Sequence, residues 1–133
     1  MKTSKVLDSW ALLAYFEGQE SGAKVVEILK QASKGSFDLL ISVINWGEIL
    51  YIIEMRHGRD KRDEVERFMN QMQLDIIHAD RELTREAAGL KAAYKLPYAD
   101  CFAAALAKTR KAAVVTGDKD FEPLEKEIRI EWL

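Results

Sequence analysis

The sequence has few of the residues on which secreted and membrane proteins depend. Cys101 is its single cysteine, so an intramolecular disulfide and a multi-cysteine zinc site are both excluded. No apolar stretch is long enough to span a bilayer. The apolar run at 10–16 is short, follows an aspartate and lacks the small-residue cleavage pattern of a signal peptide. These absences predict a protein of the reducing cytoplasm that does not associate with a membrane.

The composition is that of a folded domain with a charged surface. Hydrophobic residues make up 48% of the 133 residues and charged residues 32%, a balance that favours a globular core over disorder. A chain of this length is most simply one domain, so we expect residues 1–133 to form a single unit. The formal net charge is only -2, which by itself does not establish a nucleic-acid partner.

Short apolar segments alternate along the chain with longer segments of helical periodicity. Strands are expected at residues 6–7, 37–42, 74–78, 113–116 and 128–132. Helices are expected at 9–17, between 21 and 35, from 42 to about 57, at 59–72, from 80 to about 94 and at 98–109, with a helical turn at 121–125. This alternation predicts an α/β fold, with a central parallel sheet flanked by helices on both faces.

Four acidic residues stand where a folded domain usually places something else. They follow two of the expected strands or lie near the start of two expected helices: Asp8, Asp118, Glu48 and Asp100. Because parallel sheets bind ligands beyond the carboxyl ends of their strands, all four can approach one crevice. Buried carboxylates without partners are costly, and a divalent metal is the simplest partner for so much negative charge. The pattern favours metal-dependent hydrolysis, most simply of a phosphodiester.

Each acid also has a structural explanation when it is considered alone. Asp8 suits the N-cap of the first helix, and Asp100 suits the positive end of a helix. Asp118 and Asp120 lie in a Gly-Asp-Lys-Asp sequence that is typical of a turn. Glu48 is harder to explain, because its neighbours are apolar, although a buried salt bridge to an arginine would satisfy it. Taken together, the positions favour a shared site.

Four segments, in this order, resemble the PIN-domain nucleases, and most closely the VapC-type toxins of bacterial and archaeal toxin–antitoxin pairs. They are Val-Leu-Asp8-Ser, Ser42-Val-Ile-Asn45-Trp-Gly-Glu48-Ile-Leu-Tyr51, Leu96-Pro-Tyr-Ala-Asp100-Cys-Phe-Ala-Ala-Ala-Leu-Ala and Val115-Thr-Gly-Asp118-Lys-Asp120-Phe121. The Asn-x-x-Glu and Thr-Gly-Asp-Lys-Asp-Phe elements are specific, whereas an aspartate after a first strand is common. The resemblance covers nearly the full length and implies a single PIN-like domain.

The resemblance implies an endoribonuclease that hydrolyses RNA phosphodiester bonds with a water activated by Mg²⁺ or Mn²⁺. The catalytic acids would be a quartet: Asp8, Glu48, Asp100 and Asp118. We expect Asp8, Asp100 and Asp118 to bind the metal directly. Glu48 is expected to bind through a water or to orient the attacking water, and Asp120 to contribute more peripherally.

Residue types and positions suggest further members of the site, and the resemblance suggests partners. Ser42, Asn45 and Thr116 are candidates to hydrogen-bond the carboxylates. A cationic cluster near Asp118 in the sequence is the candidate for contacts with the RNA: Lys108, Arg110, Lys111 and Lys119. A VapB-type antitoxin protein would silence the enzyme, and two copies would form a homodimer.

Several alternatives stay open on sequence grounds. A second basic cluster at 56–62 is interleaved with acids, so phosphate contact and a solvated helix face are about equally favoured. Receiver domains and haloacid dehalogenase-like phosphatases need an acid pair or Asp-x-Asp at the first strand, and Asp8-Ser9-Trp10 argues against both. A non-enzymatic RNA- or protein-binding module on the same fold remains the competing hypothesis.

Overall fold

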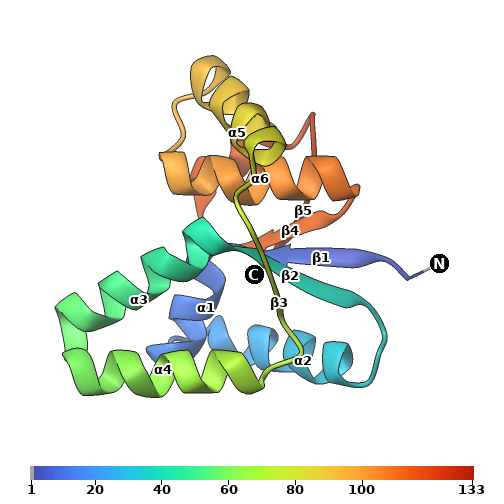
Figure 1. Cartoon of the computed structure of the whole chain (residues 1–133). Helices are drawn as coiled ribbons and strands as arrows, with labels where there is room; N and C mark the ends of the chain where they lie inside the picture. The colour runs from blue at the N-terminus through green and yellow to red at the C-terminus, as the bar shows by residue number, and fades with distance from the viewer. Residues whose placement is uncertain (1) are drawn as a thin grey trace.

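The fold is built around one parallel sheet (Figure 1). The computed structural model describes residues 2–133. Five strands, in the order β3-β2-β1-β4-β5, all run parallel to their neighbours. Their bounds are β1 Ser4–Leu7, β2 Asp38–Ser42, β3 Asp75–Ile77, β4 Ala113–Thr116 and β5 Arg129–Trp132. The predicted parallel sheet is confirmed, and β1 and β4 are neighbours at its centre.

Helices connect the strands and end close to the predicted positions. They are α1 Ser9–Phe16, α2 Gly22–Ser33, α3 Val43–His57, α4 Arg59–Gln71, α5 Arg81–Ala93, α6 Tyr98–Arg110 and the 3-10 helix η1 Lys119–Leu124. Asp80 and Ser42 cap α5 and α3 with their side chains. Ser21, at the start of α2, has helical φ and ψ and makes no side-chain cap bond.

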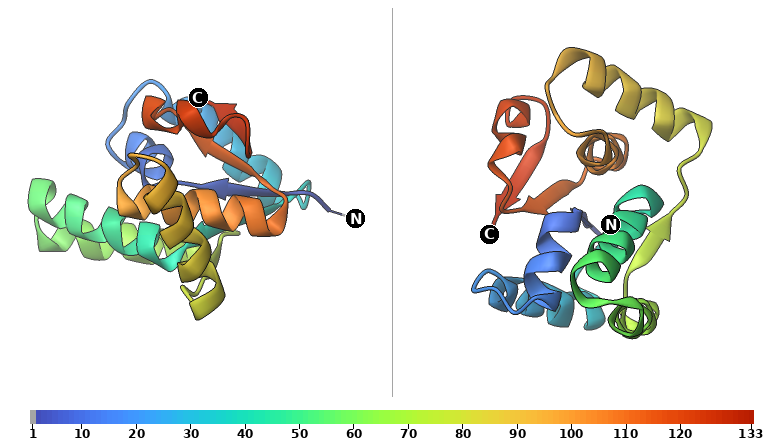
Figure 2. Two further views of the ribbon diagram at one scale, coloured as in Figure 1. Left: turned by 90° about the horizontal axis from the view of Figure 1, so that it is seen from above. Right: turned by 90° about the vertical axis from the view of Figure 1, so that its left-hand side faces the viewer.

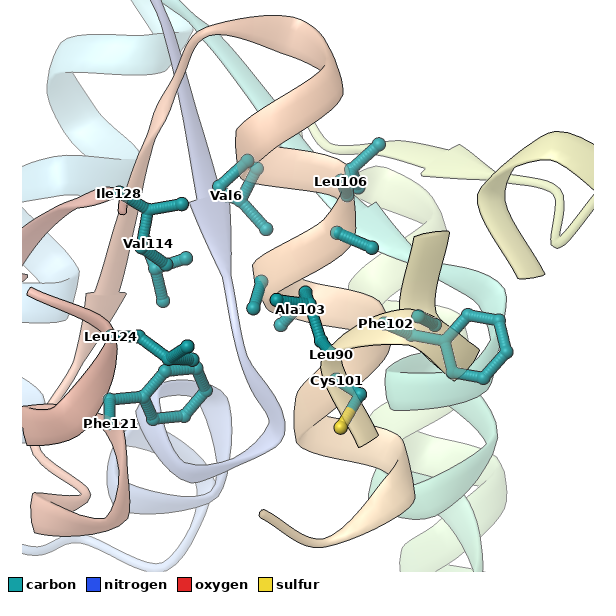
Figure 3. Packing of buried hydrophobic residues seen from close by; sticks show 14 of the residues in the cluster. Val6, Leu90, Cys101, Phe102, Ala103, Leu106, Val114, Phe121, Leu124 and Ile128 are labelled. Atoms are coloured by element: carbon teal, nitrogen blue, oxygen red, sulfur yellow. The ribbon is translucent and has the colours of Figure 1, made fainter. Parts of the chain in front are cut away.

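Helices cover both faces of the sheet, as predicted, and create two cores (Figure 2). On one face α6 lies against the strands and α5 packs outside it. The side chains of Ala103, Ala104, Ala105 and Ala107 are buried, and their small size lets α6 approach the sheet closely. Figure 3 shows Phe121 and Leu124 of η1 on the opposite side of this core from Phe102.

The second core lies on the other face of the sheet, where α1, α2, α3 and α4 gather. Leu12, Val25, Ile49 and Met69 contribute from these four helices, and all are essentially inaccessible to solvent. Gly58 joins α3 to α4 with φ of 91°, a conformation that glycine adopts without strain. The α3–α4 hairpin extends beyond the carboxyl edge of the sheet (Figure 1).

Within residues 2–133, every helix is too short or too polar to cross a bilayer. Six large apolar side chains of the described residues are exposed, on the surfaces of α3, α4, α6 and β5. They are Ile44, Tyr51, Met55, Phe68, Tyr98 and Trp132. Three of them follow one side of α3, which starts next to the carboxyl edge of the sheet.

Candidate metal centre

The two central strands deliver two of the four predicted acids to the same edge of the sheet. Leu7 of β1 lies opposite Val115 of β4, and the acids follow at Asp8 and Asp118. Each acid also caps a helix. Asp8 Oδ1 accepts the backbone N–H of Ala11 at 2.9 Å, and Asp118 Oδ1 accepts that of Asp120 at 2.9 Å. The capping role and the site position are therefore compatible.

The other two acids come from helices that start at this edge. Asp100 lies in the first turn of α6 and is buried, with 8% of its surface exposed. Glu48 lies in the second turn of α3 and is half-buried. Asp100 lies close enough to Asp8, Asp118 and Glu48 for their charges to raise its pKa. The structure thus brings the predicted quartet together.

Three carboxylates come close enough to share one cation. Asp100, Asp118 and Asp120 each offer an oxygen, and these oxygens lie within 4.8 Å of one another. Asp120, expected at the periphery, is thus part of the tightest group, because the 3-10 turn at η1 returns its side chain toward Asp118. Asp8 is outside this group, and its direct ligation of a metal stays a prediction.

Asp8 is fully buried and both of its carboxylate oxygens accept hydrogen bonds. Its pKa is raised from 3.8 to about 7, chiefly by burial and also by the charge of Asp118, although the hydrogen bonds from Thr116 and Ala11 lower it. Thr116 Oγ1 donates to Asp8 Oδ2 and accepts the backbone N–H of Asp118 at 2.9 Å. The Thr116 hydroxyl therefore joins the two strand-end acids.

The pKa of Asp100 is raised from 3.8 to about 8, chiefly by burial and then by the charges of Asp8, Asp118, Glu48 and Asp120. Within residues 2–133, no ion pair includes any of these five acids. The missing positive charge is therefore not supplied by a lysine, arginine or histidine. A carboxylate group of this kind suits a hard divalent cation such as Mg²⁺ or Mn²⁺.

The other two predicted hydrogen-bond donors have different partners. Ser42 Oγ donates to Asn45 Oδ1 at 2.6 Å. Asn45 Nδ2 donates to Ser9 Oγ at 3.2 Å and to the carbonyl oxygen of Ala99 at 3.1 Å. Asn45, one turn before Glu48 on α3, therefore contacts the residues next to Asp8 and Asp100, and Ser42, the N-cap of α3, contacts Asn45.

Gly117 occupies a position that admits no side chain. A Cβ at this residue would lie 2.3 Å from Cη2 of Trp10. Trp10 is half-buried in the first turn of α1, between the segments that carry Asp8 and Asp118. The contact of Trp10 with Gly117 places the indole against the loop that presents Asp118.

The predicted RNA-binding cluster does not gather at the acids. Lys119 is exposed beside Asp118, but Lys108 lies eight residues beyond Asp100 on α6, about 12 Å along the helix axis. Arg110 and Lys111 lie further on and precede β4, whereas Asp118 follows it. We expected these three residues to lie near Asp118, but they lie at the opposite end of β4. The strand begins beside the end of α6 and runs the length of the sheet before it reaches Asp118.

Lys108 and three of the four basic residues at 56–62 form ion pairs. Lys108 pairs with Glu86 and Glu127, each at 3.3 Å. In the cluster at 56–62, Arg56 pairs with Glu17 and Arg62 with Glu54 and Asp63 at 2.6–2.7 Å, and Lys61 pairs with Glu64 at 3.4 Å. The solvated-face interpretation of this second cluster is therefore the better supported.

Sequence reasoning missed Ser9 as a member of the site. Its hydroxyl is buried, with 3% of the residue exposed, and donates to the carbonyl oxygen of Asn45 at 3.2 Å. A serine after an aspartate at the start of a helix is common, so its identity carried no signal. Only its position directly after Asp8 could have drawn attention to it.

Comparison with known families gives one match over most of the chain. The model of the PIN domain matches residues 5–127. A comparison with curated proteins gives no match. The four segments from which the resemblance was inferred all lie within or overlap the matched range.

Solved structures with the same arrangement include toxin–antitoxin proteins. A chain of VapBC2 from Rickettsia felis, bound to a DNA fragment from its promoter, is 17% identical with a TM-score of 0.76, covering 98% of this chain and 99% of that one. DNA-bound VapBC from Salmonella typhimurium is 22% identical with a TM-score of 0.73, covering 98% of each chain. The sarcin–ricin loop cleaving toxin VapC20 from Mycobacterium tuberculosis is 13% identical with a TM-score of 0.70, covering 90% of this chain and 93% of that one. At these identities the likeness establishes a shared fold.

Proposed function

Because the chain belongs to the PIN domain family, we propose that it is a metal-dependent endoribonuclease that acts as the toxin of a toxin–antitoxin pair. One observation carries the proposal. Five carboxylates meet at the carboxyl edge of the sheet, and no cationic side chain among residues 2–133 forms an ion pair with them. A binding module without catalysis would have no need of so costly a cluster.

The residues divide into distinct roles. Asp100, Asp118 and Asp120 would hold Mg²⁺ or Mn²⁺, with Asp8 and Glu48 beside them. When bound, such an ion supplies Lewis-acid chemistry for hydrolysis of a phosphodiester by water. Glu48 is half-buried and faces the group from α3, so it orients the attacking water and accepts its proton. Thr116 keeps Asp8 directed at the loop that carries Asp118.

RNA is the substrate class that we propose. A relative described as cleaving the sarcin–ricin loop supports it. Lys119, exposed next to Asp118, is the cationic side chain best placed to contact a phosphate beside the scissile bond. The other basic residues of the predicted cluster would contact only RNA that extends beyond the far end of α6.

The proposed protein partner is a VapB-type antitoxin, which is supported by the VapBC complexes among the similar structures. A hollow between α1 and α4 is lined by apolar side chains and by one charged pair: Tyr15, Phe16, Val65 and Phe68, with Lys61 and Glu64. The ring centroids of Tyr15 and Phe16 lie 5.8 and 6.0 Å from that of Phe68. We propose that an apolar antitoxin segment covers this surface, that two copies form a homodimer, and that the protein acts in the cytoplasm.

Cleavage of cellular RNA by the purified, antitoxin-free protein tests the proposal. Total RNA is incubated with Mn²⁺ or Mg²⁺, or with EDTA, and Asp100→Asn serves as the inactive control. We expect discrete products that require both the metal and Asp100, and the sequences at their ends would identify the target. Wild-type protein that binds Mn²⁺ but cleaves no RNA would support the non-enzymatic module instead.

A further inference from the structure

The side-chain amide of Asn45 connects the three segments that carry Asp8, Glu48 and Asp100. Asn45 is fully buried on α3, three residues before Glu48. Its Nδ2 donates to Ser9 Oγ at 3.2 Å, and Ser9 directly follows Asp8. The same nitrogen donates to the carbonyl oxygen of Ala99 at 3.1 Å, and Ala99 directly precedes Asp100. One planar group thus contacts a neighbour of each of two site acids.

The orientation of this amide is fixed by its partners. Asn45 Oδ1 accepts the hydroxyl of Ser42 at 2.6 Å, and Ser42 Oγ accepts the backbone N–H of Asn45 at 3.1 Å. Ser9 Oγ donates to the backbone carbonyl of Asn45 at 3.2 Å. A flipped amide would place Oδ1 against the carbonyl of Ala99, two acceptors without a proton between them. The network therefore permits a single arrangement.

The first turn of α6 has few other attachments of this kind. Pro97 stands at its N-cap position and provides no side-chain cap bond. Asp100 lies three residues further on, in the same turn as Ala99, whose carbonyl oxygen accepts a hydrogen bond from Asn45. Because the carboxylates repel one another, a first turn without this bond would hold Asp100 less firmly beside the other acids. The bond from Asn45 opposes such a shift, in addition to the buried side chains of Cys101 and Phe102.

We propose that Asn45 is a positioning residue, which holds Asp100, relative to the segments of Asp8 and Glu48, in the place that a divalent cation shared with Asp118 and Asp120 requires. The inference rests on the proposed metal-dependent function, and it assigns to Asn45 no contact with substrate or metal. Loss of a residue that orients metal ligands lowers metal affinity by about 10–100-fold. The amide acts through two donated hydrogen bonds, so its shape alone is not sufficient.

The test measures Mn²⁺ affinity by calorimetry, together with kcat and KM for RNA, in Asn45→Ala and Asn45→Asp. Asn45→Asp preserves the size and the acceptor for Ser42, but it presents an oxygen to the carbonyl of Ala99. We expect both variants to bind Mn²⁺ about 10–100-fold more weakly, with kcat reduced and KM little changed. Ser9→Ala leaves the bond to Ala99 intact but removes the other partner of the amide, so its Mn²⁺ affinity should fall by a smaller but measurable amount.

Two controls separate positioning from a general loss of stability. Ile28→Ala removes buried side-chain atoms in α2 and destabilises the fold without touching the network. Asn70→Ala changes the other asparagine of the chain, which is exposed on α4. Both should retain wild-type Mn²⁺ affinity at a temperature where all variants are folded.

The outcomes distinguish this inference from the proposed function. Wild-type protein that fails to bind Mn²⁺ or to cleave RNA would refute the proposed function. Wild-type protein that does both, with Asn45→Ala matching Ile28→Ala in Mn²⁺ affinity, would overturn the role of Asn45 alone. If the Asn45 variants do not fold, Ser9→Ala decides, and an unchanged Mn²⁺ affinity in that variant overturns the proposal.

Discussion

Trp10 lies against Gly117 so closely that a β-carbon on this glycine would lie 2.3 Å from Cη2 of the indole and 2.4 Å from Cζ3. Both partners belong to segments that carry acids, since Trp10 follows Asp8 on α1 and Gly117 precedes Asp118. The glycine in this loop is therefore required by side-chain packing. The position of Asp118 depends on a contact between α1 and the end of β4.

Gly117→Ala should disturb both the fold and the metal centre. The methyl group displaces either the Trp10 ring or the loop, and overpacking of this kind costs about 1–3 kcal/mol. We expect a lower free energy of unfolding in urea and weaker Mn²⁺ binding, because Asp118 moves with the loop. Gly89→Ala is the control, since a Cβ there meets nothing within 4 Å and helix propensity favours alanine. Recovery of Mn²⁺ affinity in Gly117→Ala combined with Trp10→Phe would show that the ring is the obstacle; no recovery would contradict it.

Thr116→Val should lower stability because it removes a hydroxyl with two buried partners. The substitution preserves the shape but leaves Asp8 Oδ2 and the backbone N–H of Asp118 without the Thr116 oxygen. An unsatisfied buried polar group costs about 1–3 kcal/mol, and the pKa of Asp8 should rise further. Urea unfolding measures the loss. Thr116→Ser retains the hydroxyl and should lose clearly less; equal losses would mean that the methyl group, and not the hydrogen bonds, matters.

The sequence was sufficient to locate the strand-end acids because backbone topology determines where they lie. In a parallel sheet the residues after neighbouring strands share an edge, so Asp8 and Asp118 meet once β1 and β4 pair. Helix periodicity likewise placed Asp100 and Glu48 within the first two turns of α6 and α3. These predictions needed only element order and direction.

What the sequence did not reveal depends on side-chain packing and on distances between ends of elements. Lys108 and Asp118 are close along the chain, yet Lys108 is near the end of α6, before β4, and Asp118 follows β4. The length of the strand therefore separates them. Asp120 joins Asp100 and Asp118 only because η1 begins at Lys119 and not at residue 121. The bond between Asn45 and Ala99 joins residues 54 apart, and no local pattern in the sequence encodes it.

The stability of the metal-free protein should fall as pH rises from about 4 to 8. Below about pH 4, Asp8 and Asp100 are protonated in both the folded and the unfolded chain. As pH rises, the unfolded chain loses these protons near 3.8, whereas the folded protein keeps them until about 7 and about 8. The folded state then binds more protons, so its stability declines with pH. Urea unfolding in EDTA measures this, with Asp100→Asn as reference. The wild type should become less stable relative to that variant as pH increases, and a constant difference would contradict the raised pKa of Asp100.

Stabilisation by Mn²⁺ should be larger at pH 8 than at pH 6. Metal binding requires ionised carboxylates, and Asp100, with a pKa of about 8 in the metal-free protein, must release its proton on binding. Thermal unfolding with and without Mn²⁺ measures the difference in Tm at each pH. Calorimetry in two buffers of different ionisation enthalpy should detect the released proton. No proton release at pH 6 would show that the metal binds without Asp100.

Lys119→Ala should weaken RNA binding more than Arg110→Ala does. Both side chains are exposed, but Lys119 is next to Asp118, whereas Arg110 lies in the last turn of α6, at the opposite end of the helix from Asp100. A lysine that contacts one phosphate contributes about one unit to the slope of log affinity against log salt. We therefore expect a higher KM and a shallower salt dependence in Lys119→Ala, with kcat retained, and neither change in Arg110→Ala. Equal effects of the two substitutions would mean that the bound RNA reaches along α6, as the order of basic residues in the sequence first suggested.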